Sequence, residues 1–129
     1  MELGWGHQRL FGNITLTGEF ERDKLNGYGK KEYFTSDGVH VIEVGEFVDN
    51  ELRGFGKRQY LGTVESGTWR NGRINGMGVV EKANGIVAEG IFVNGVQHGF
   101  GTSKTASGYK YTGNFEHGIV MGKGMLTFP

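Results

Sequence analysis

The chain has 129 residues, and its 14 lysines and arginines are balanced by 14 aspartates and glutamates. This balance gives no electrostatic reason to expect nucleic-acid binding, and the absence of cysteine excludes a disulfide framework and a cysteine metal site. No apolar stretch approaches the roughly 18 residues of a membrane-spanning helix, and the N-terminus does not resemble a signal peptide, so we expect a cytoplasmic protein.

Glycine is the unusual feature of the composition, with 25 glycines against one proline. A flexible, low-complexity linker would contain few aromatic residues, whereas this chain has nine Phe, five Tyr and two Trp. Abundant glycine combined with abundant aromatics predicts a backbone geometry that is repeated along the chain.

A repeat is visible once the chain is aligned on a Gly-x-aromatic triplet. Nine residues after the first glycine of this triplet comes a Gly-x-Gly triplet, and the spacing holds in all five copies. Gly4-Trp5-Gly6 fits the Gly-x-Gly position ahead of the first copy. We therefore expect a single repeat domain over 1–129. It comprises a partial repeat over 1–17 and repeats that begin near residues 18, 45, 67, 90 and 113, the last of them incomplete.

A turn separates the two triplets of each repeat. Asn71-Gly72 and Asn94-Gly95 are strong signals for two-residue hairpin turns, in which both residues need a positive φ. Asp23 and Asn50 occupy the same glycine position in earlier repeats and tolerate that conformation, and His117-Gly118 completes the set. No segment has a sustained helical period, so each repeat is predicted to be a β-hairpin.

The first full repeat is longer than the others. From Gly29 to Gly38 is nine residues, against seven from Gly78 to Gly85, and the return arm to Gly45 is also two residues longer than its counterparts. An even insertion on both arms keeps every side chain on its own face of the sheet. This predicts a longer hairpin that projects beyond its neighbours.

Pairing across the hairpins assigns side chains to the two faces of the sheet. With Asn71-Gly72 as the turn, we expect Trp69 opposite Ile74 and Gly67 opposite Gly76. Cross-strand apolar pairs of this kind stabilise one face of a sheet. The corresponding pairs in the other repeats are Phe20 with Leu25, Phe47 with Leu52, Phe92 with Gln97, and Phe115 with Val120.

The middle residues of the Gly-x-Gly triplets form a row on the opposite face. We call this set the Gly-x-Gly row, and its members are Trp5, Tyr28, Phe55, Met77 and Phe100. One interpretation is that the row packs on itself inside the curl of the sheet. The other is that it contacts a partner protein, because exposed apolar rows mark interaction sites and aromatics with Met suit hot spots.

The sequence gives no sign of catalytic, metal or cofactor chemistry. His7, His40, His98 and His117 follow no ligand spacing, and the last two hold different positions in successive repeats. Glu19 and Glu46 recur with the repeat, which favours a backbone-bonding or strand-pairing role. No helix follows the Gly-x-Gly triplets, so they cannot hold a dinucleotide in the usual way. We expect a protein that is not an enzyme and has no cofactor.

Two basic residues suggest an alternative kind of site. Lys31 and Arg58 hold matching positions in adjacent hairpins and would lie in one cross-strand ladder. Such a ladder could bind anionic phospholipid headgroups.

With these residues in hand, the chain resembles the MORN (membrane occupation and recognition nexus) repeat family. That family's pattern is Tyr-x-Gly-Glu-aromatic, then a turn, then Gly-x-Gly. Residues 18–29 and 45–56 match it best, together with Tyr111-Thr112-Gly113. The resemblance implies an all-β fold: a single-layered, twisted antiparallel sheet of tandem hairpins forming an elongated trough. It also implies scaffolding roles at the cytoskeleton or at membranes.

Three functions remain open at this point. The first is a protein-interaction scaffold or adaptor that holds an extended or helical segment of a partner along the trough. The second is peripheral binding to anionic phospholipids, and the third is a regulatory module of a larger enzyme. Unpaired strands at the two ends could also pair with another copy of the chain and form a homo-oligomer.

Overall fold

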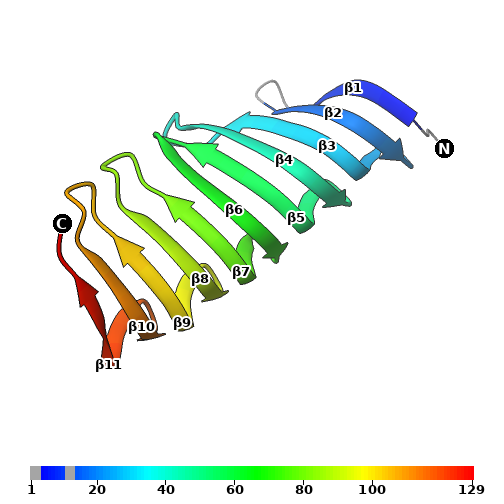
Figure 1. The fold of residues 1–129 in the computed structure, drawn as a ribbon. Coiled ribbons are helices and arrows are strands. Elements are labelled where there is room, and N and C mark those ends of the chain that lie inside the picture. The colour runs from blue at the N-terminus through cyan, green and yellow to red at the C-terminus, as the bar shows by residue number, and fades with distance from the viewer. Residues whose placement is uncertain (1–3, 11–13) are drawn as a thin grey trace.

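All regular secondary structure in the described part of the protein is β-strand. The computed structural model describes residues 4–10, as backbone, and residues 14–129. Eleven strands form one antiparallel sheet whose spatial order is the order of the sequence, β1 to β11. Figure 1 shows this single layer as a staircase of hairpins from the N-terminal to the C-terminal end. The predicted all-β, single-layered array is confirmed.

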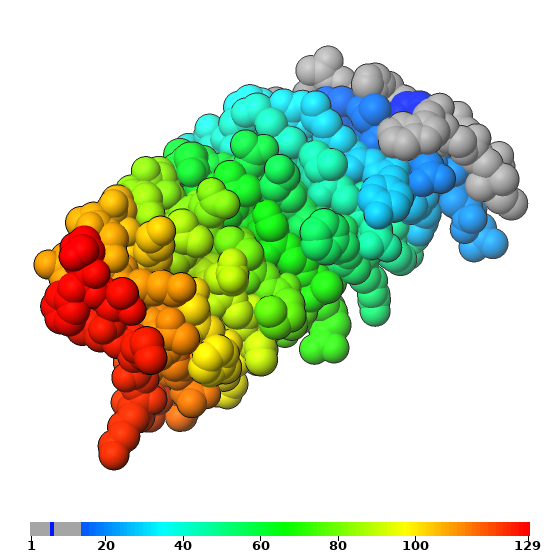
Figure 2. Space-filling view, viewed as in Figure 1, coloured from blue at the N-terminus to red at the C-terminus, as the bar shows by residue number. Residues whose placement is uncertain are grey.

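The strands follow one another with short connections. Their bounds are β1 Gly4–Leu10, β2 Ile14–Glu21, β3 Lys24–Phe34, β4 His40–Val48, β5 Glu51–Tyr60, β6 Thr63–Arg70, β7 Arg73–Glu81, β8 Val87–Val93, β9 Val96–Lys104, β10 Lys110–Glu116 and β11 Ile119–Thr127. The space-filling view shows the same order along the long axis of an elongated molecule (Figure 2).

The two-residue turns lie where the sequence predicts them. Both residues of each turn have a positive φ: for example 54° and 78° at Asn71 and Gly72, and 49° and 86° at Asn94 and Gly95. This is the backbone of a type I′ turn, whose twist matches that of the strands it joins. Residues 22–23, 49–50 and 117–118 adopt the same conformation.

One predicted pairing is wrong. Gly67 pairs with Gly78, not with Gly76, although Trp69 does pair with Ile74. Three residues of β7 therefore oppose one residue of β6, which is a bulge with two extra residues. The glycines permit it: a Cβ on Gly67 would lie 2.8 Å from the Cα of Gly78. Because the bulge adds an even number of residues, the predicted facing of the side chains survives.

The core lies on one face of the sheet, which we call the inner face. The predicted pairs Phe20–Leu25, Phe47–Leu52 and Trp69–Ile74 form there, and all six side chains are buried.

Two predicted pairs differ from these. Phe92 pairs with Gln97, whose buried amide donates to the carbonyls of Glu89 and Thr102. Val120 pairs with Phe115 on the edge strand and stays exposed. Phe92 and Phe115 are buried as well, and the remaining buried apolar side chains of the described residues are Leu16, Val41 and Val80.

A single-layered sheet buries this face because successive repeats stack turn over strand. Asn50 donates its backbone N–H to the carbonyl of Leu25, and its side chain accepts the Leu25 N–H at 2.7 Å. The backbone N–H of Gly95 likewise donates to the carbonyl of Ile74, at 2.9 Å. These turns therefore rest on a strand of the preceding repeat, so contacts between neighbouring repeats contribute to stability. The strands bend as they cross the molecule, which makes the sheet a shallow trough (Figure 1).

The longer first hairpin is present in the ladder between β3 and β4. Six pairs run from Gly29–Gly45 to Phe34–His40, against four pairs from Gly78–Gly90 to Glu81–Val87 in β7 and β8. The two additional pairs match the insertion of two residues on each arm.

Candidate functional site

The Gly-x-Gly row lies on the outer face, opposite the core. Tyr28, Phe55, Met77 and Phe100 stand on β3, β5, β7 and β9, and their exposed fractions are 58%, 60%, 63% and 59%. The buried core aromatics lie on the inner face, so the interpretation in which the row packs inside the curl does not hold for these four. The backbone of Trp5 pairs with Glu19, and its side chain lies outside the described residues.

A glycine of the bulge precedes Tyr28, Phe55, Met77 and Phe100. These glycines lie in the left-handed region, for example Gly27 at φ 107° and Gly76 at φ 102°. A Cβ on Gly27 would lie 2.7 Å from Oε1 of Glu19, and one on Gly76 would lie 2.8 Å from Oγ1 of Thr68. Glycine therefore serves two needs here, the backbone conformation and the space that the neighbouring side chain occupies.

The recurrent glutamates fix the backbone of the row. Oε1 of Glu19 accepts the N–H of Tyr28 at 2.8 Å, and Oε1 of Glu46 accepts the N–H of Phe55 at 3.1 Å. These N–H groups belong to the bulge, where Tyr28 has no partner in the β2–β3 ladder and Phe55 has none in the β4–β5 ladder. The expected backbone-bonding role of the glutamates is confirmed. In the next repeats Thr68 donates its hydroxyl to Asn75, and Ile91 adds an exposed apolar side chain.

An apolar hollow separates two members of the row. Its volume is about 290 Å³, and Phe55, Met77 and Val79 contribute its apolar lining. The paired glycines Gly67 and Gly78 also line it, and because they lack side chains they leave the space between the two large residues open. The outer face is therefore hollowed, not flat, at this point.

The two basic residues of the alternative site lie on the inner face instead. They belong to one cross-strand row that alternates in charge: Lys31, Glu43, Arg58 and Glu65. Lys31 donates to the carbonyl of Asn50 at 3.2 Å. The sequence predicts the shared ladder, and continuing the register across the next strands would also have found the two acidic residues within it.

Arg58 is the centre of this cluster. Its guanidinium donates to Glu65 at 3.1 Å, to Glu43 at 3.4 Å and to the carbonyl of Gly72 at 3.0 Å, and it lies 4.5 Å from the ring centroid of Trp69. Burial opposes its charge, but the two carboxylates outweigh burial and raise the pKa of Arg58 above its ordinary value. Arg58 thus ties three successive repeats together.

Tyr33 completes the cluster at its outer end. Its hydroxyl donates to Oε2 of Glu43 at 3.0 Å. Burial, followed by the negative charge of Glu43, raises the pKa of Tyr33 to about 12. The tyrosine is therefore held in its neutral, hydrogen-bonding form far into the alkaline range.

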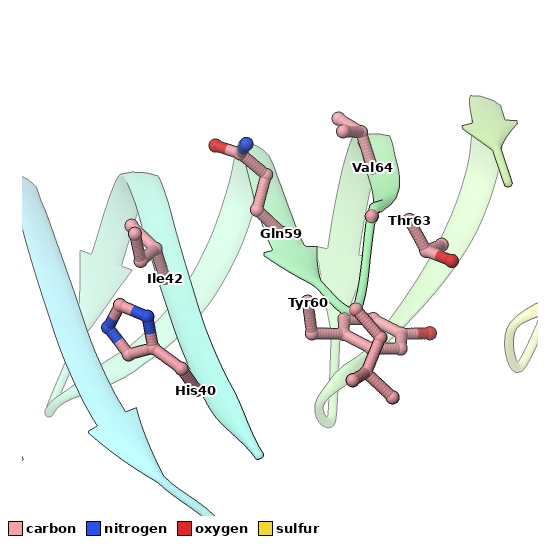
Figure 3. A pocket seen from close by; sticks show the side chains of 8 residues that line it. His40, Ile42, Gln59, Tyr60, Thr63 and Val64 are labelled. Atoms are coloured by element: carbon pink, nitrogen blue, oxygen red, sulfur yellow. The ribbon is translucent and has the colours of Figure 1, made fainter. Parts of the chain in front are cut away.

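A second hollow, of about 310 Å³, lies where β4, β5 and β6 meet (Figure 3). His40 and Ile42 reach it from β4, and Tyr60 and Thr63 from the next two strands. Nε2 of His40 lies 2.6 Å from Glu32, and this hydrogen bond holds the pKa of the Glu32 carboxyl below its usual range. His40 also stacks on Phe34, so it belongs to the longer first hairpin.

The sequence does not predict that two histidines meet at the fourth repeat. The ring centroids of His98 and His117 are 5.3 Å apart, and the N–H of His117 donates to Nδ1 of His98 at 3.4 Å. Within 14–129, no three His, Cys, Asp or Glu side chains lie close enough together to hold a metal ion.

The fold and the outer face define a class: a hairpin-repeat protein in which four successive repeats each place a large exposed side chain in the Gly-x-Gly row. The family model of the MORN repeat matches residues 17–37, 44–60, 66–87, 89–108 and 111–129. The chain belongs to the MORN repeat family. Such repeats are generally non-catalytic and commonly serve in interactions or membrane binding.

Two further findings concern the chain. The curated proteins contain no match to it. In the part of the chain that the structure describes, no helix is long and apolar enough to cross a membrane.

Proposed function

We propose that the chain is a non-catalytic interaction module that holds a segment of a partner protein along the Gly-x-Gly row. The supporting observation is the regular exposure of four large side chains, each between 58% and 63% exposed, on alternate strands of one face. A scaffold or adaptor of this kind needs no chemistry of its own. It needs a rigid row of contacts, which the repeat supplies.

The row has no role in the core that would account for its apolar character. The inner-face aromatics, such as Phe47 at 2% exposure and Trp69 at 3%, bury the surface that stabilises the fold. The row residues leave most of their surface in water. Burying a side chain of this size against a partner contributes about 1.5–3 kcal/mol. Tyrosine, phenylalanine and methionine are also enriched where proteins bind one another.

The hollow between Phe55 and Met77 gives the surface a shape that a side chain can fill. Hot spots of interfaces are well-packed, desolvated pockets surrounded by weaker contacts. The rigid sheet beneath holds the two walls in place before binding, which reduces the entropy lost when a partner docks.

A selection from a library of displayed random peptides tests the proposal directly. Peptides selected on the unmodified chain should bind the Phe55→Ala/Met77→Ala variant at least about tenfold more weakly. The control is Val48→Ala/Val93→Ala, which removes exposed apolar side chains beside the two-residue turns and should leave affinity unchanged. Equal binding to both variants would count against the row as the site. Urea unfolding verifies that the variants are folded.

The alternative of phospholipid binding relies on Lys31 and Arg58, and our proposal does not use them. Arg58 is occupied by two carboxylates and a carbonyl, and Lys31 by a carbonyl of the next repeat. Co-sedimentation with anionic liposomes at low and high salt tests this alternative, because headgroup binding weakens as salt screens the charges.

A further inference from the structure

Building on the proposed function, we propose that the partner segment is a polyproline II helix that sets an apolar side chain against the Gly-x-Gly row at every third position. The spacing of the row selects ligands whose side chains recur at the same distance. Its members stand on every second strand, and neighbouring strands lie about 4.7–4.9 Å apart, so the spacing along the row is about 9.4–9.8 Å.

Few backbone conformations of a partner segment return a side chain to the same side at this distance. A polyproline II helix has three residues per turn and a rise of about 3.1 Å, so one side of it recurs every ~9.3 Å. An extended strand returns to the same face after about 6.8 Å, which does not match. An α-helix returns to nearly the same side after seven residues, or about 10.5 Å.

The mismatch between the spacing of an α-helical ligand and the spacing of the row grows with each interval. From Tyr28 to Phe100 there are three intervals, or about 28–29 Å. Nine residues of polyproline II cover about 28 Å. Three heptads of α-helix cover about 31.5 Å, so the last contact would miss its place by about 2–3 Å. The ligand that stays in register over all four described side chains is the polyproline II helix.

The surface between the row members favours the same ligand. Gly67 and Gly78 line the hollow between Phe55 and Met77, and equivalent glycine pairs occur beside Tyr28 and Phe100. Segments rich in proline dock in grooves lined by aromatic side chains, because they enter already ordered. The hollow between Phe55 and Met77 would thus be one of a series with the period of the repeat.

Polar groups beside the row suit a backbone with free carbonyls. Polyproline II has no internal hydrogen bonds, so its carbonyls are available, whereas those of an α-helix are taken. Ser66 lines the hollow and its cross-strand partner Lys57 is exposed, so both can donate to such carbonyls. The strands also change direction gradually along the array (Figure 1), and a helix without internal hydrogen bonds bends to follow them.

Calorimetric titration with designed peptides tests the match between the spacing of the ligand and that of the row. A peptide of four Leu-Pro-Pro triplets should bind, and one extra proline between the second and third triplets should weaken binding by about tenfold because it breaks the register. Phe55→Ala should weaken the first peptide by a similar factor, and Val93→Ala should not. Equal affinity of the two peptides would overturn the inference.

A third peptide separates this inference from the function on which it rests. It is an α-helical peptide with leucine at every seventh position. Tighter binding of this peptide than of the triplet peptide would overturn the polyproline II ligand and leave a partner-binding row in place. Failure of the triplet peptide to bind also overturns the inference. The random-peptide selection then decides separately whether the row binds partners at all.

Discussion

The Oδ1 atom of Asn75 accepts the backbone N–H of Asn94 at 3.0 Å, which joins one repeat to the turn of the next. Asn26 does the same for Asp49 at 3.2 Å, and His98 for His117 at 3.4 Å. Each acceptor directly follows an inner-face residue of its strand. A polar side chain at this position therefore bonds one repeat to the turn of the next, and we call such a side-chain bond a staple.

Removing a staple should destabilise the array. Asn75→Ala leaves the N–H of Asn94 without its acceptor, and we expect a loss of about 1 kcal/mol in the free energy of unfolding by urea. At the fourth repeat, His98→Asn should keep the stability that His98→Ala loses, since asparagine is the residue used at 26 and 75. Equal stability of the two His98 variants would show that the bond contributes nothing. Arg53→Ala, an exposed side chain at the same repeat position, is the control.

The glycine pair of the bulge should tolerate no side chain. A Cβ on Gly67 would lie 2.5 Å from the carbonyl oxygen of Met77, and its φ is 152°. We expect Gly67→Ala to cost at least about 3 kcal/mol, because both backbone and neighbour must move. Gly72→Ala has a positive φ of 78° but meets nothing within 4 Å, so it should cost only about 1–2 kcal/mol. Similar losses in the two variants, measured by urea unfolding, would refute the steric explanation.

The Arg58 cluster should be sensitive to the loss of its cation. The side chains of Arg58 and Glu43 are 21% and 7% exposed, so Arg58→Ala leaves a nearly buried carboxylate unpaired. We expect a loss of about 3 kcal/mol. Glu43→Gln in the same chain should restore part of it, because the neutral amide no longer needs a counter-charge. If the double variant is as unstable as the single one, the unpaired Glu43 is not the cause, and the loss comes from the other Arg58 contacts, to Glu65, Gly72 and Trp69.

Alkaline pH should weaken the fold through Tyr33. Its pKa is raised from 10.0 to about 12 in the folded chain, so between these values the folded state binds the proton that the unfolded state has lost. Stability is therefore fully present below pH 10 and falls as the pH rises toward 12. Tyr33→Phe should show a shallower fall in urea-unfolding free energy over this range. Burial also raises the pKa of Tyr60. Phenolate absorbance of the unmodified chain, titrated in parallel, should therefore show Tyr33 and Tyr60 ionising late, and Tyr33→Phe should remove one of the two.

The hairpins, their turns and the facing of their side chains follow from the sequence because each depends on local chemistry. Asn71-Gly72 selects a turn, and alternation along the strands then separates Trp69 from Met77. The pairing of Gly67 with Gly78 could not be counted from the turn, since counting assumes a regular ladder. The bulge depends on how closely two backbones approach, which becomes visible only in three dimensions.

The exposed position of the row and the meeting of His98 with His117 were also beyond the sequence. Both depend on the direction in which the sheet bends and on how one repeat rests on the next. Hairpin register fixes partners within a repeat but not the contacts between one repeat's turn and its predecessor. The charge row through Arg58 is different: continuing the register from Lys31 across three strands places both carboxylates, so it was within reach of the sequence.

Within residues 14–129, three turns are joined to a strand of the preceding repeat by bonds between backbone atoms alone, as between Gly95 and Ile74. Such joints do not depend on which side chains point away from the core. The exposed residues of the Gly-x-Gly row can therefore change with little effect on folding, and the specificity of the array can diverge while its architecture stays constant. The same separation makes the chain a suitable frame for engineered recognition, in which one residue per repeat is varied and the rest is retained.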